Sequence, residues 1–265
     1  MGRRIALRLA TGKGIVRVVD SSPEALTSAK KYIESALPGL STTEKLDARN
    51  VAYSDELESA VQDAWLITEA IPEKLPVKQQ LFKKLDRIAP QDAILATNSS
   101  SFASSELIDG VIFPERVVNT HYLMPPDRNA VEVMSCGKTD PAVIDLIIGE
   151  LPKFGFHPFR VHNESRGFIF NRIWAAIKRE ALLVLAEGVS TPADIDRIFE
   201  LSVLTNVGPL RMMDVIGLDV VLDIEEHYAA VNPSLPEAPR RLLQEYVGKG
   251  WLGVKTGRGF YEYAR

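Results

Sequence analysis

A histidine and a glutamate on either side of a proline-containing loop are the residues of this sequence best suited to chemistry. His121 lies in the segment NTHYL and Glu132 in AVEVM, and both segments have the apolar pattern of short strands. The loop 124–129 between them holds two prolines, which lack an amide donor and fix φ, so the chain must turn there. Two strand ends joined in this way can bring an imidazole and a carboxylate within hydrogen-bond distance.

A carboxylate bound to one ring nitrogen of a histidine fixes the tautomer and makes the other nitrogen a better base. Such a pair can serve as a general acid/base near neutral pH. The alternative interpretation is a half-buried histidine and an unrelated surface glutamate. The elements that position the two side chains decide between these interpretations.

The bulk composition argues against several classes of protein. The chain has 265 residues, which suits one large domain or two modest domains. Its net charge is -4 and it has no run of basic residues, so the sequence gives no indication of nucleic-acid binding. No apolar run approaches the roughly 20 residues of a membrane helix, so we expect no membrane partner. Cys136 is the only cysteine, which predicts no internal disulfide and a reducing, cytoplasmic location. The four histidines lack metal-ligand spacing, so we expect no metal.

The chain divides into two parts by its pattern of elements. Up to residue 163, short apolar strands alternate with amphipathic helices, which is typical of an α/β fold with a parallel sheet. From residue 164 the pattern is helical throughout, which predicts an all-α domain over 164–265. The expected strands are 15–19, 51–53, 64–70 and 94–97; the expected helices are 3–10, 23–37, 76–89, 167–188, 192–202, 209–230 and 237–247.

Two residues near the start match part of a dinucleotide-binding motif. In a doubly wound fold, glycines after the first strand open a helix that meets a pyrophosphate, and an acidic residue about 20 positions later binds the adenosine ribose. Gly2 and Asp20 have this interval, and Asp20 would repel a 2′-phosphate, which favours NAD over NADP. The first strand and the other two glycines are absent from the sequence. A glycine and an aspartate at this distance can equally be a coincidence.

Polar residues follow two of the expected strands, and one interrupts an apolar helix. Residues 71–73 follow the strand 64–70, and residues 98–100 follow the strand 94–97, where an α/β sheet forms its ligand crevice. A run of Asn and Ser is otherwise typical of a turn or a helix cap. Asn171 lies in an apolar helix, where an amide needs a partner. The amide is satisfied either by capping or by packing between helices, or it points into the cleft between the domains.

Together these segments resemble the L-3-hydroxyacyl-CoA dehydrogenase family over nearly the whole chain. The resemblance implies a Rossmann-like NAD-binding domain over 1–163, with its first strand absent, followed by a helical substrate and dimerisation domain over 164–265. The matching stretches are MGRRIA, VVDSSPEAL, TEAIPEKLPVKQQLFKKLD, ATNSSS, the segment from His121 to Glu132, GFIFNR, IKREALLVLAEGVSTPADID, VGP, DVIGLD and GVKTGRGFYEY.

The resemblance also implies a reaction and the residues that perform it. An L-3-hydroxyacyl-CoA would be oxidised to its 3-keto form by NAD, as in fatty acid metabolism, in a cytoplasmic homodimer formed through the helical domain. His121 would be the acid/base, Glu132 would orient it, and Ser100 and Asn171 would hold the substrate oxygen. The residues that fall where the family contacts NAD are Gly2, Asp20, Ala70, Ile71, Glu73, Lys78, Asn98, Ser100 and Lys255. Lys255 is alternatively a solvated lysine in a C-terminal turn.

Two departures from the family concern the substrate. Met124 stands where the family has an asparagine that contacts substrate, and methionine cannot donate a hydrogen bond to a carbonyl. The serine and lysine that contact CoA have no clear equivalents at 34–36 and 38–41, and Lys45 cannot be placed. A free 3-hydroxy acid or a sugar acid, as in gulonate dehydrogenase, is therefore an alternative substrate.

The third departure is the absent first strand, which leaves the pyrophosphate loop incomplete. We expect either that the printed start is an internal methionine of a longer chain or that this form binds NAD poorly. A non-catalytic, crystallin-like homologue is the alternative outside enzymes. The absent glycines favour that alternative, whereas the presence of Ser100, His121, Glu132 and Asn171 opposes it, because a structural role needs none of them.

Overall fold

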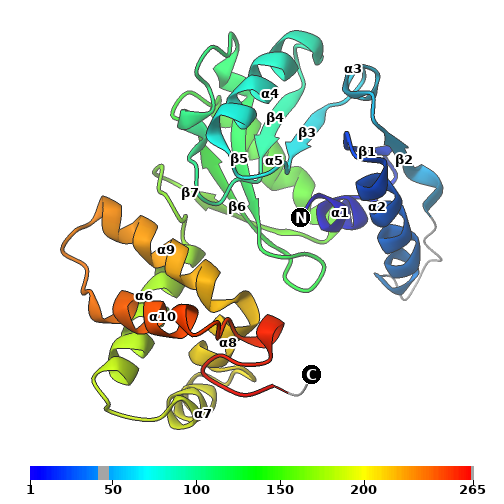
Figure 1. The fold of residues 1–265 in the computed structure, drawn as a ribbon. Helices are drawn as coiled ribbons and strands as arrows, with labels where there is room; N and C mark the ends of the chain where they lie inside the picture. Colours follow the sequence, from blue (N-terminus) through cyan, green and yellow to red (C-terminus); the bar gives the residue numbers. More distant parts are fainter. Residues whose placement is uncertain (41–47, 264–265) are drawn as a thin grey trace. The chain divides into compact units, whose positions relative to one another are not determined.

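The computed structural model describes residues 1–40 and 48–263, which form two compact units (Figure 1). The first unit spans Met1–Ile169 and the second Phe170–Arg265. Lys45 lies outside the described residues. Short 3-10 turns occur at Leu37–Leu40, Ala48–Asn50, Ser104–Glu106, Pro114–Arg116, Leu151–Phe154 and Val254–Thr256.

Within residues 1–40 and 48–169, the first unit contains two sheets. A two-stranded parallel sheet pairs β1 with β2, and a five-stranded sheet has the order β3-β4-β5-β6-β7. All neighbours run parallel except β5 and β6. The prediction of a parallel sheet is therefore wrong for the pair β5 and β6. These two strands are joined by a short loop, and a short loop can join only antiparallel neighbours. The strands are β1 (Val16–Val19), β2 (Val51–Ser54), β3 (Leu66–Glu69), β4 (Ile94–Thr97), β5 (Val117–Tyr122), β6 (Ala130–Ser135) and β7 (His157–Val161).

Three helices of the first unit begin where the sequence supplies a cap or an early proline. At α2, Pro23 is the first residue and the Ser22 hydroxyl accepts from the Ala25 amide at 3.2 Å. The helices predicted at 3–10, 23–37 and 76–89 are confirmed as α1, α2 and α4, whereas α5 and β7 were not predicted. The helices are α1 (Gly2–Leu9), α2 (Pro23–Ala36), α3 (Leu57–Ala60), α4 (Leu75–Ile88) and α5 (Pro141–Glu150).

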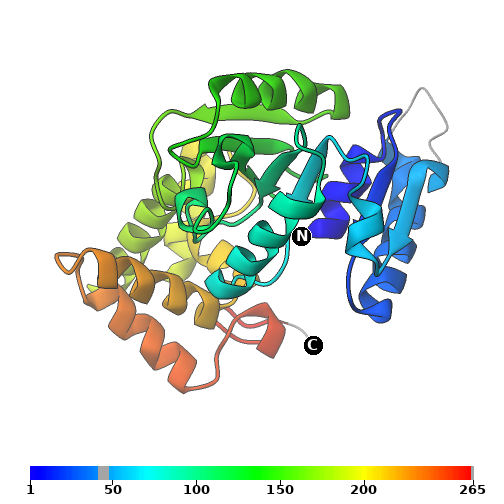
Figure 2. The same cartoon turned by 90° about the horizontal axis from the view of Figure 1, so that it is seen from above.

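The central strands are buried on both faces, which is why they consist of continuous apolar residues. Leu95 of β4 packs with Phe82 of α4, whereas its neighbour Ile94 packs with Ile147 of α5. Successive residues of a strand point to opposite faces, so α4 and α5 cover opposite faces of the five-stranded sheet (Figure 2). The strand ends beyond Thr97 are thereby held in fixed positions.

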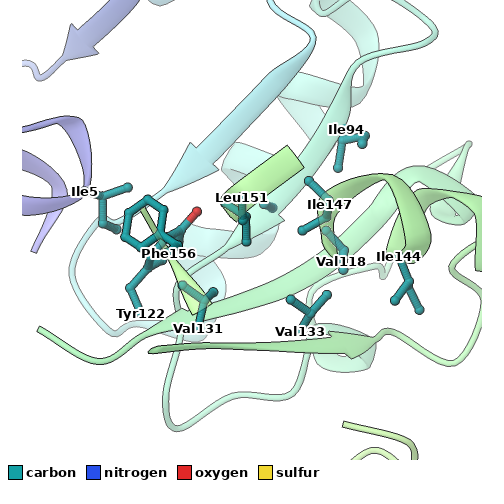
Figure 3. Close-up of a cluster of buried hydrophobic side chains, with 11 residues drawn as sticks. Ile5, Ile94, Val118, Tyr122, Val131, Val133, Ile144, Ile147, Leu151 and Phe156 are labelled. Carbon is teal, nitrogen blue, oxygen red and sulfur yellow. The ribbon is translucent and has the colours of Figure 1, made fainter. Parts of the chain in front are cut away.

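Helix α1 links the two sheets. Its Ile5 is buried in the core of the larger sheet beside Tyr122 and Phe156 (Figure 3). Its Leu7 packs instead with Ile33 of α2 in the cluster under β1 and β2. Among the described residues, β1 and β3 each pair with a strand on one side only, so the two sheets meet through α1 rather than through a shared strand.

Over its described residues, 170–263, the second unit consists of five α-helices around one apolar core. The expected helix 167–188 begins only at Phe170, because Gly167 and Phe168 both have positive φ, 77° and 53°, which a right-handed helix cannot contain. The expected helix 209–230 is two helices, because the chain turns at Gly217 with φ +106°. The helices are α6 (Phe170–Ala186), α7 (Pro192–Val203), α8 (Pro209–Ile216), α9 (Leu218–Val231) and α10 (Ala238–Gly248). Among the residues described, no helix is long and apolar enough to cross a membrane.

Candidate active site

His121 and Glu132 are direct cross-strand partners on β5 and β6. The Nδ1 atom of His121 lies 2.8 Å from Oε2 of Glu132, and both residues are buried. The structure therefore contains the contact between His121 and Glu132 that their spacing in the sequence allows. With Nδ1 donating to the carboxylate, Nε2 is the ring nitrogen that can exchange a proton with a ligand.

A tight turn after β7 completes the surroundings of this pair. The Phe168 ring stacks on the His121 imidazole, with the ring centroids 4.7 Å apart and the planes 17° apart. The next amide, that of Ile169, donates to Oε1 of Glu132 at 2.8 Å. One carboxylate oxygen therefore holds the imidazole while the other is held by the backbone. The sequence did not predict these contacts, and Gly167 before an apolar residue was the only signal of the turn.

We expect Phe168→Leu to lower kcat by a factor of about 2–10, because an aromatic pair contributes about 0.5–1.5 kcal/mol beyond its buried area. Leucine keeps the apolar volume but not the stacking that restrains the imidazole. Steady-state kinetics of the variant measure this effect, and the KM for NADH should stay unchanged. Phe159→Leu, on an exposed position of β7, is the control. Unchanged kcat in Phe168→Leu would show that the stack does not position His121.

The end of β4 lies beside His121. The Asn98 side chain accepts a hydrogen bond from the Tyr122 amide at 3.0 Å, which fixes the residues after β4 against the end of β5. Ser99 is buried and donates to the Glu73 carboxylate. Ser100 is exposed, and its hydroxyl has no hydrogen-bond partner within the described part of the chain. Of the two serines, only Ser100 has its hydroxyl free for a ligand.

A buried amide on β5 also holds this loop. Asn119 is fully buried, and its Nδ2 atom lies 3.4 Å from the carbonyl oxygens of Ser99 and Phe102. Residues two apart share a face of a strand, so Asn119 and His121 lie on the same face of β5. The loop with Ser100 is thus fastened to the strand that carries His121. A polar residue inside an apolar strand was the signal that the sequence offered.

A buried ion pair supports the residues after β3. Glu69 accepts from the Lys78 ammonium at 2.7 Å, from the Ile71 amide at 2.7 Å and from the Thr97 hydroxyl at 2.6 Å. Lys78 also lies 3.1 Å from Glu73 and is only 1% exposed. Its ammonium is therefore engaged by the protein, and the structure places Lys78 under the turn that carries Ile71 and Glu73.

Glu73 lies among these groups with its side chain 36% exposed. Burial alone would raise its pKa, but the Ser99 hydroxyl, the Lys78 ammonium and the Ser101 amide together hold the pKa below its usual range. A depressed folded-state pKa contributes stability above the unfolded pKa of about 4.3, and that contribution is lost as the pH falls through the folded value. Glu73 therefore contributes stability that disappears in acid.

We expect Glu73→Gln to be less stable than the wild type at neutral pH and to lose less stability in acid. The reason is that glutamine keeps an acceptor but carries no charge to be protonated. Urea unfolding midpoints at about pH 7 and about pH 3.5, on either side of the unfolded pKa, measure the difference. Glu115→Gln, at an exposed position, is the control. Parallel pH dependence in the wild type and Glu73→Gln would contradict the assignment.

The residues predicted for a dinucleotide lie around the start of α1 and the end of β1. Helix α1 has no side-chain cap, so the first amides of the helix, at Gly2 and Arg3, are free to meet an anion. A Cβ on Gly2 would be 3.6 Å from the Ala70 Cβ, so α1 begins beside the residues after β3. Asp20 is exposed after β1, with Oδ1 accepting from the Ser22 amide. These residues fit NAD, with α1 toward the pyrophosphate and Asp20 toward the ribose.

Two of the predicted residues lie in the second unit. Asn171 is in the first turn of α6 and is partly exposed. The Lys255 ammonium lies 2.6 Å from each carboxylate oxygen of Asp219, at the start of α9, and remains exposed. The other predicted residues all belong to the first unit. No group of three or more His, Cys, Asp or Glu side chains that could hold a metal ion occurs within residues 1–40 and 48–263.

Comparisons with known proteins agree over the whole chain. Residues 1–165 match the model of the 3-hydroxyacyl-CoA dehydrogenase NAD binding domain, and residues 167–263 match that of the 3-hydroxyacyl-CoA dehydrogenase C-terminal domain. A probable 3-hydroxybutyryl-CoA dehydrogenase of Bacillus subtilis (strain 168) is 34% identical over 99% of this chain and 94% of its own length.

Solved structures give the same result. The (S)-3-hydroxybutyryl-CoA dehydrogenase of Ralstonia eutropha superposes with a TM-score of 0.89 at 29% identity, over 100% of this chain and 96% of its own. A diketoreductase superposes with a TM-score of 0.84 at 30% identity, over 98% of this chain and 94% of its own.

The first unit has a dinucleotide-binding fold with polar residues at its strand ends, and the second unit is helical. Together they define an NAD-dependent oxidoreductase. Both family models match, one to each part of the chain. They identify one family within the class of NAD-dependent oxidoreductases. The chain belongs to the 3-hydroxyacyl-CoA dehydrogenase family.

Proposed function

We propose that this enzyme interconverts an L-3-hydroxyacyl-CoA and its 3-keto form through His121 and Glu132, as a step of fatty acid metabolism. The observation that carries the proposal is the 2.8 Å contact between His121 Nδ1 and Glu132 Oε2 beside the loop of Ser100. The relatives named 3-hydroxybutyryl-CoA dehydrogenase support the substrate class.

His121 accepts and returns the proton of the substrate hydroxyl. Bound NAD would supply the hydride acceptor for C3 of the substrate, in the overall reaction of a hydroxyacyl thioester and NAD⁺ to the keto thioester, NADH and a proton. Nε2 of His121 removes the hydroxyl proton during oxidation and returns it during reduction. Glu132 keeps the proton of Nδ1 in place and stabilises the imidazolium that forms. General acid/base catalysis of this kind contributes about 10²–10⁴-fold.

The developing negative charge on the substrate oxygen needs hydrogen-bond donors. Ser100 offers a hydroxyl without a partner in the described residues, and Asn171 offers an amide. We assign both to this oxygen, because donors aimed at a developing charge stabilise the transition state more than the ground state. The cofactor is held by Gly2, Asp20, Ala70, Ile71, Glu73, Asn98, Ser100 and Lys255, with Lys78 supporting the turn after β3.

A second candidate function is the reduction of a substrate without CoA, such as a free 3-keto acid or sugar acid. It rests on Met124, which is exposed in the loop between His121 and Glu132, with φ +62°, and cannot donate to a carbonyl. The likeness to a diketoreductase also favours it. A crystallin-like, non-catalytic role is opposed by the hydrogen-bonded pair of His121 and Glu132, which such a role does not need.

One assay separates the three functions. NADH oxidation is measured with acetoacetyl-CoA and then with a panel of free 3-keto acids. We expect turnover with acetoacetyl-CoA. Turnover with free acids alone would overturn the CoA thioester as substrate. Tight NADH binding without turnover of any compound would support the non-catalytic role.

We also propose that two copies pair through the helical unit. Several large apolar side chains are exposed there: Ile198, Leu201 and Leu204 at α7 and Val215 at α8, with Leu204 93% exposed. Apolar side chains exposed in such number commonly mark an interface, and a second copy is the commonest partner.

We expect Leu204→Glu to convert the dimer to a monomer, because the interface would have to bury an unpaired carboxylate. Light scattering after size exclusion measures the mass. Ile112→Glu, at an exposed apolar position in the first unit, should leave the dimer intact. A wild-type monomer, or a Leu204→Glu dimer as stable as the wild type, would contradict this interface.

We propose a cytoplasmic location on the ground of cysteine use. The sequence has one cysteine, and Cys136 is buried rather than available for a disulfide. Localisation of a tagged full-length chain by fractionation tests this.

A further inference from the structure

One arginine holds the loop 124–129 that joins β5 to β6. Nη1 of Arg4, in the first turn of α1, donates to the Pro125 carbonyl oxygen at 3.0 Å and lies 3.0 Å from Oδ2 of Asp127. Within residues 1–40 and 48–263, no other side chain outside this loop hydrogen-bonds to it. Hydrogen bonds with a charged donor are stronger than those between neutral groups, so Arg4 is the main side-chain support of the loop.

Helix α1 is itself fixed against the five-stranded sheet. Ile5, the residue after Arg4, is 3% exposed and packs in the core beside Tyr122 at the end of β5 (Figure 3). One turn further along α1, Nη2 of Arg8 donates to the Gly155 carbonyl oxygen at 3.0 Å. Arg4 therefore reaches the loop from a helix whose position is set by packing.

The loop needs such support because its first residue has an uncommon backbone conformation. Met124 has φ +62°, which residues with a side chain rarely adopt. A conformation of this kind persists where the surrounding contacts determine it. Inside the loop, the Arg128 amide donates to the Met124 carbonyl oxygen at 3.2 Å. The bond from Arg4 fixes the next carbonyl, that of Pro125, so the direction of the Met124 side chain depends on both contacts.

Two other roles for Arg4 fit its contacts less well. The first is an ion pair without further consequence, and the Asp127 side chain is indeed 71% exposed, where such pairs contribute little. Pro125, however, is buried, so its bond to Arg4 is better protected from water. The second is a contact with the pyrophosphate at the start of α1, but the guanidinium of Arg4 is already engaged by the loop.

We propose that Arg4 is a positioning residue for the substrate, because it holds the loop that presents Met124 three residues after His121. This inference rests on the proposed function, since Met124 stands where the family has a residue that contacts substrate. Arg4 then acts on substrate binding through the loop and touches neither the substrate nor the cofactor.

The kinetic test compares Arg4→Ala with Arg8→Ala, which removes the same kind of bond from the same helix. We expect Arg4→Ala to raise the KM for acetoacetyl-CoA by about tenfold, as the loss of one charge-assisted hydrogen bond allows. Both kcat and the NADH dissociation constant should change less than this KM. Arg4→Lys keeps a charged donor and should stay close to the wild type. Asp127→Asn should have little effect, because its ion pair is exposed.

Two outcomes of the kinetics overturn the inference. One is an equal rise of KM in Arg4→Ala and Arg8→Ala, which would mean that any loosening of α1 has this effect. The other is an unchanged KM in Arg4→Ala. If NADH binding weakened at the same time, the guanidinium of Arg4 would serve the cofactor instead of the loop.

Hydrogen exchange of the free protein gives a measurement that does not depend on activity. We expect the Arg128 amide to exchange at least about tenfold faster in Arg4→Ala, because local opening needs less free energy once a supporting contact is lost. The Leu123 amide, which donates to the Ala130 carbonyl oxygen at 3.1 Å, is the internal reference and should keep its rate. An unchanged rate at Arg128 would show that the loop keeps its conformation without Arg4 and would overturn the inference.

The exchange measurement also separates this inference from the proposed function. Faster exchange at Arg128 in a protein that turns over no 3-keto compound would support the hold of Arg4 on the loop. The same result would count against the proposed function.

Discussion

Replacement of His121 by glutamine is expected to lower kcat by about 10²–10⁴-fold while the dissociation constant for NADH stays unchanged. Glutamine can still donate a hydrogen bond to Glu132, so the strand pairing and the carboxylate keep their surroundings. It cannot take up a proton at neutral pH, so the hydroxyl proton has no acceptor. The residues assigned to the cofactor lie on other elements, which is why NADH binding should persist.

The comparison needs kcat from steady-state kinetics and the NADH dissociation constant from fluorescence titration. His157→Gln, at an exposed position on β7, is the matched control and should behave as the wild type. Glu132→Gln should lower kcat as well, because Nδ1 would lose its charged partner. Equal losses of activity and NADH binding in His121→Gln would show that His121 holds the site together rather than moving a proton.

Lys78→Met is expected to lower the free energy of unfolding by about 3–5 kcal/mol, the usual effect of breaking a buried ion pair from one side. The Glu69 carboxylate is completely buried, and its contact with Lys78 is 2.7 Å long. Methionine fills a similar volume but leaves that carboxylate without its counter-charge. The turn that carries Ile71 and Glu73 should loosen at the same time, since both residues contact this ion pair.

Urea unfolding measures the loss, and Lys83→Met on the same helix is the control. Lys83 pairs with Asp109 at the surface, 3.2 Å away, where removal of one partner costs about 0–1 kcal/mol. The double variant Lys78→Met, Glu69→Gln should recover part of the lost stability, because no unpaired charge remains. A loss in Lys78→Met no larger than that in Lys83→Met would contradict the role of this ion pair.

The sequence predicted those elements whose pattern is local. Proline and serine mark the start of α2, and a continuous apolar run marks β4 because both of its faces are covered. The contact between His121 and Glu132 followed from two short strands and a loop that can only be a hairpin. The family was identified from motifs spread over the chain, and the comparisons confirm it.

What the sequence did not predict depends on long-range packing. The turn at Gly167 and Phe168 resembled the start of a helix, because periodicity does not show that two successive residues have positive φ. The burial of Lys78 also could not be deduced from spacing, since its partner Glu69 lies nine residues earlier on a strand. The break at Gly217 lies inside an apolar pattern that continues through both helices.

NADH formation from NAD⁺ and (S)-3-hydroxybutyryl-CoA, measured for the wild type and His121→Gln side by side, tests the central claim most directly. We predict that the wild type forms NADH and that His121→Gln forms it at least about 100-fold more slowly at saturating substrate and cofactor. Equal rates in the two proteins would contradict the assignment of His121 as the acid/base.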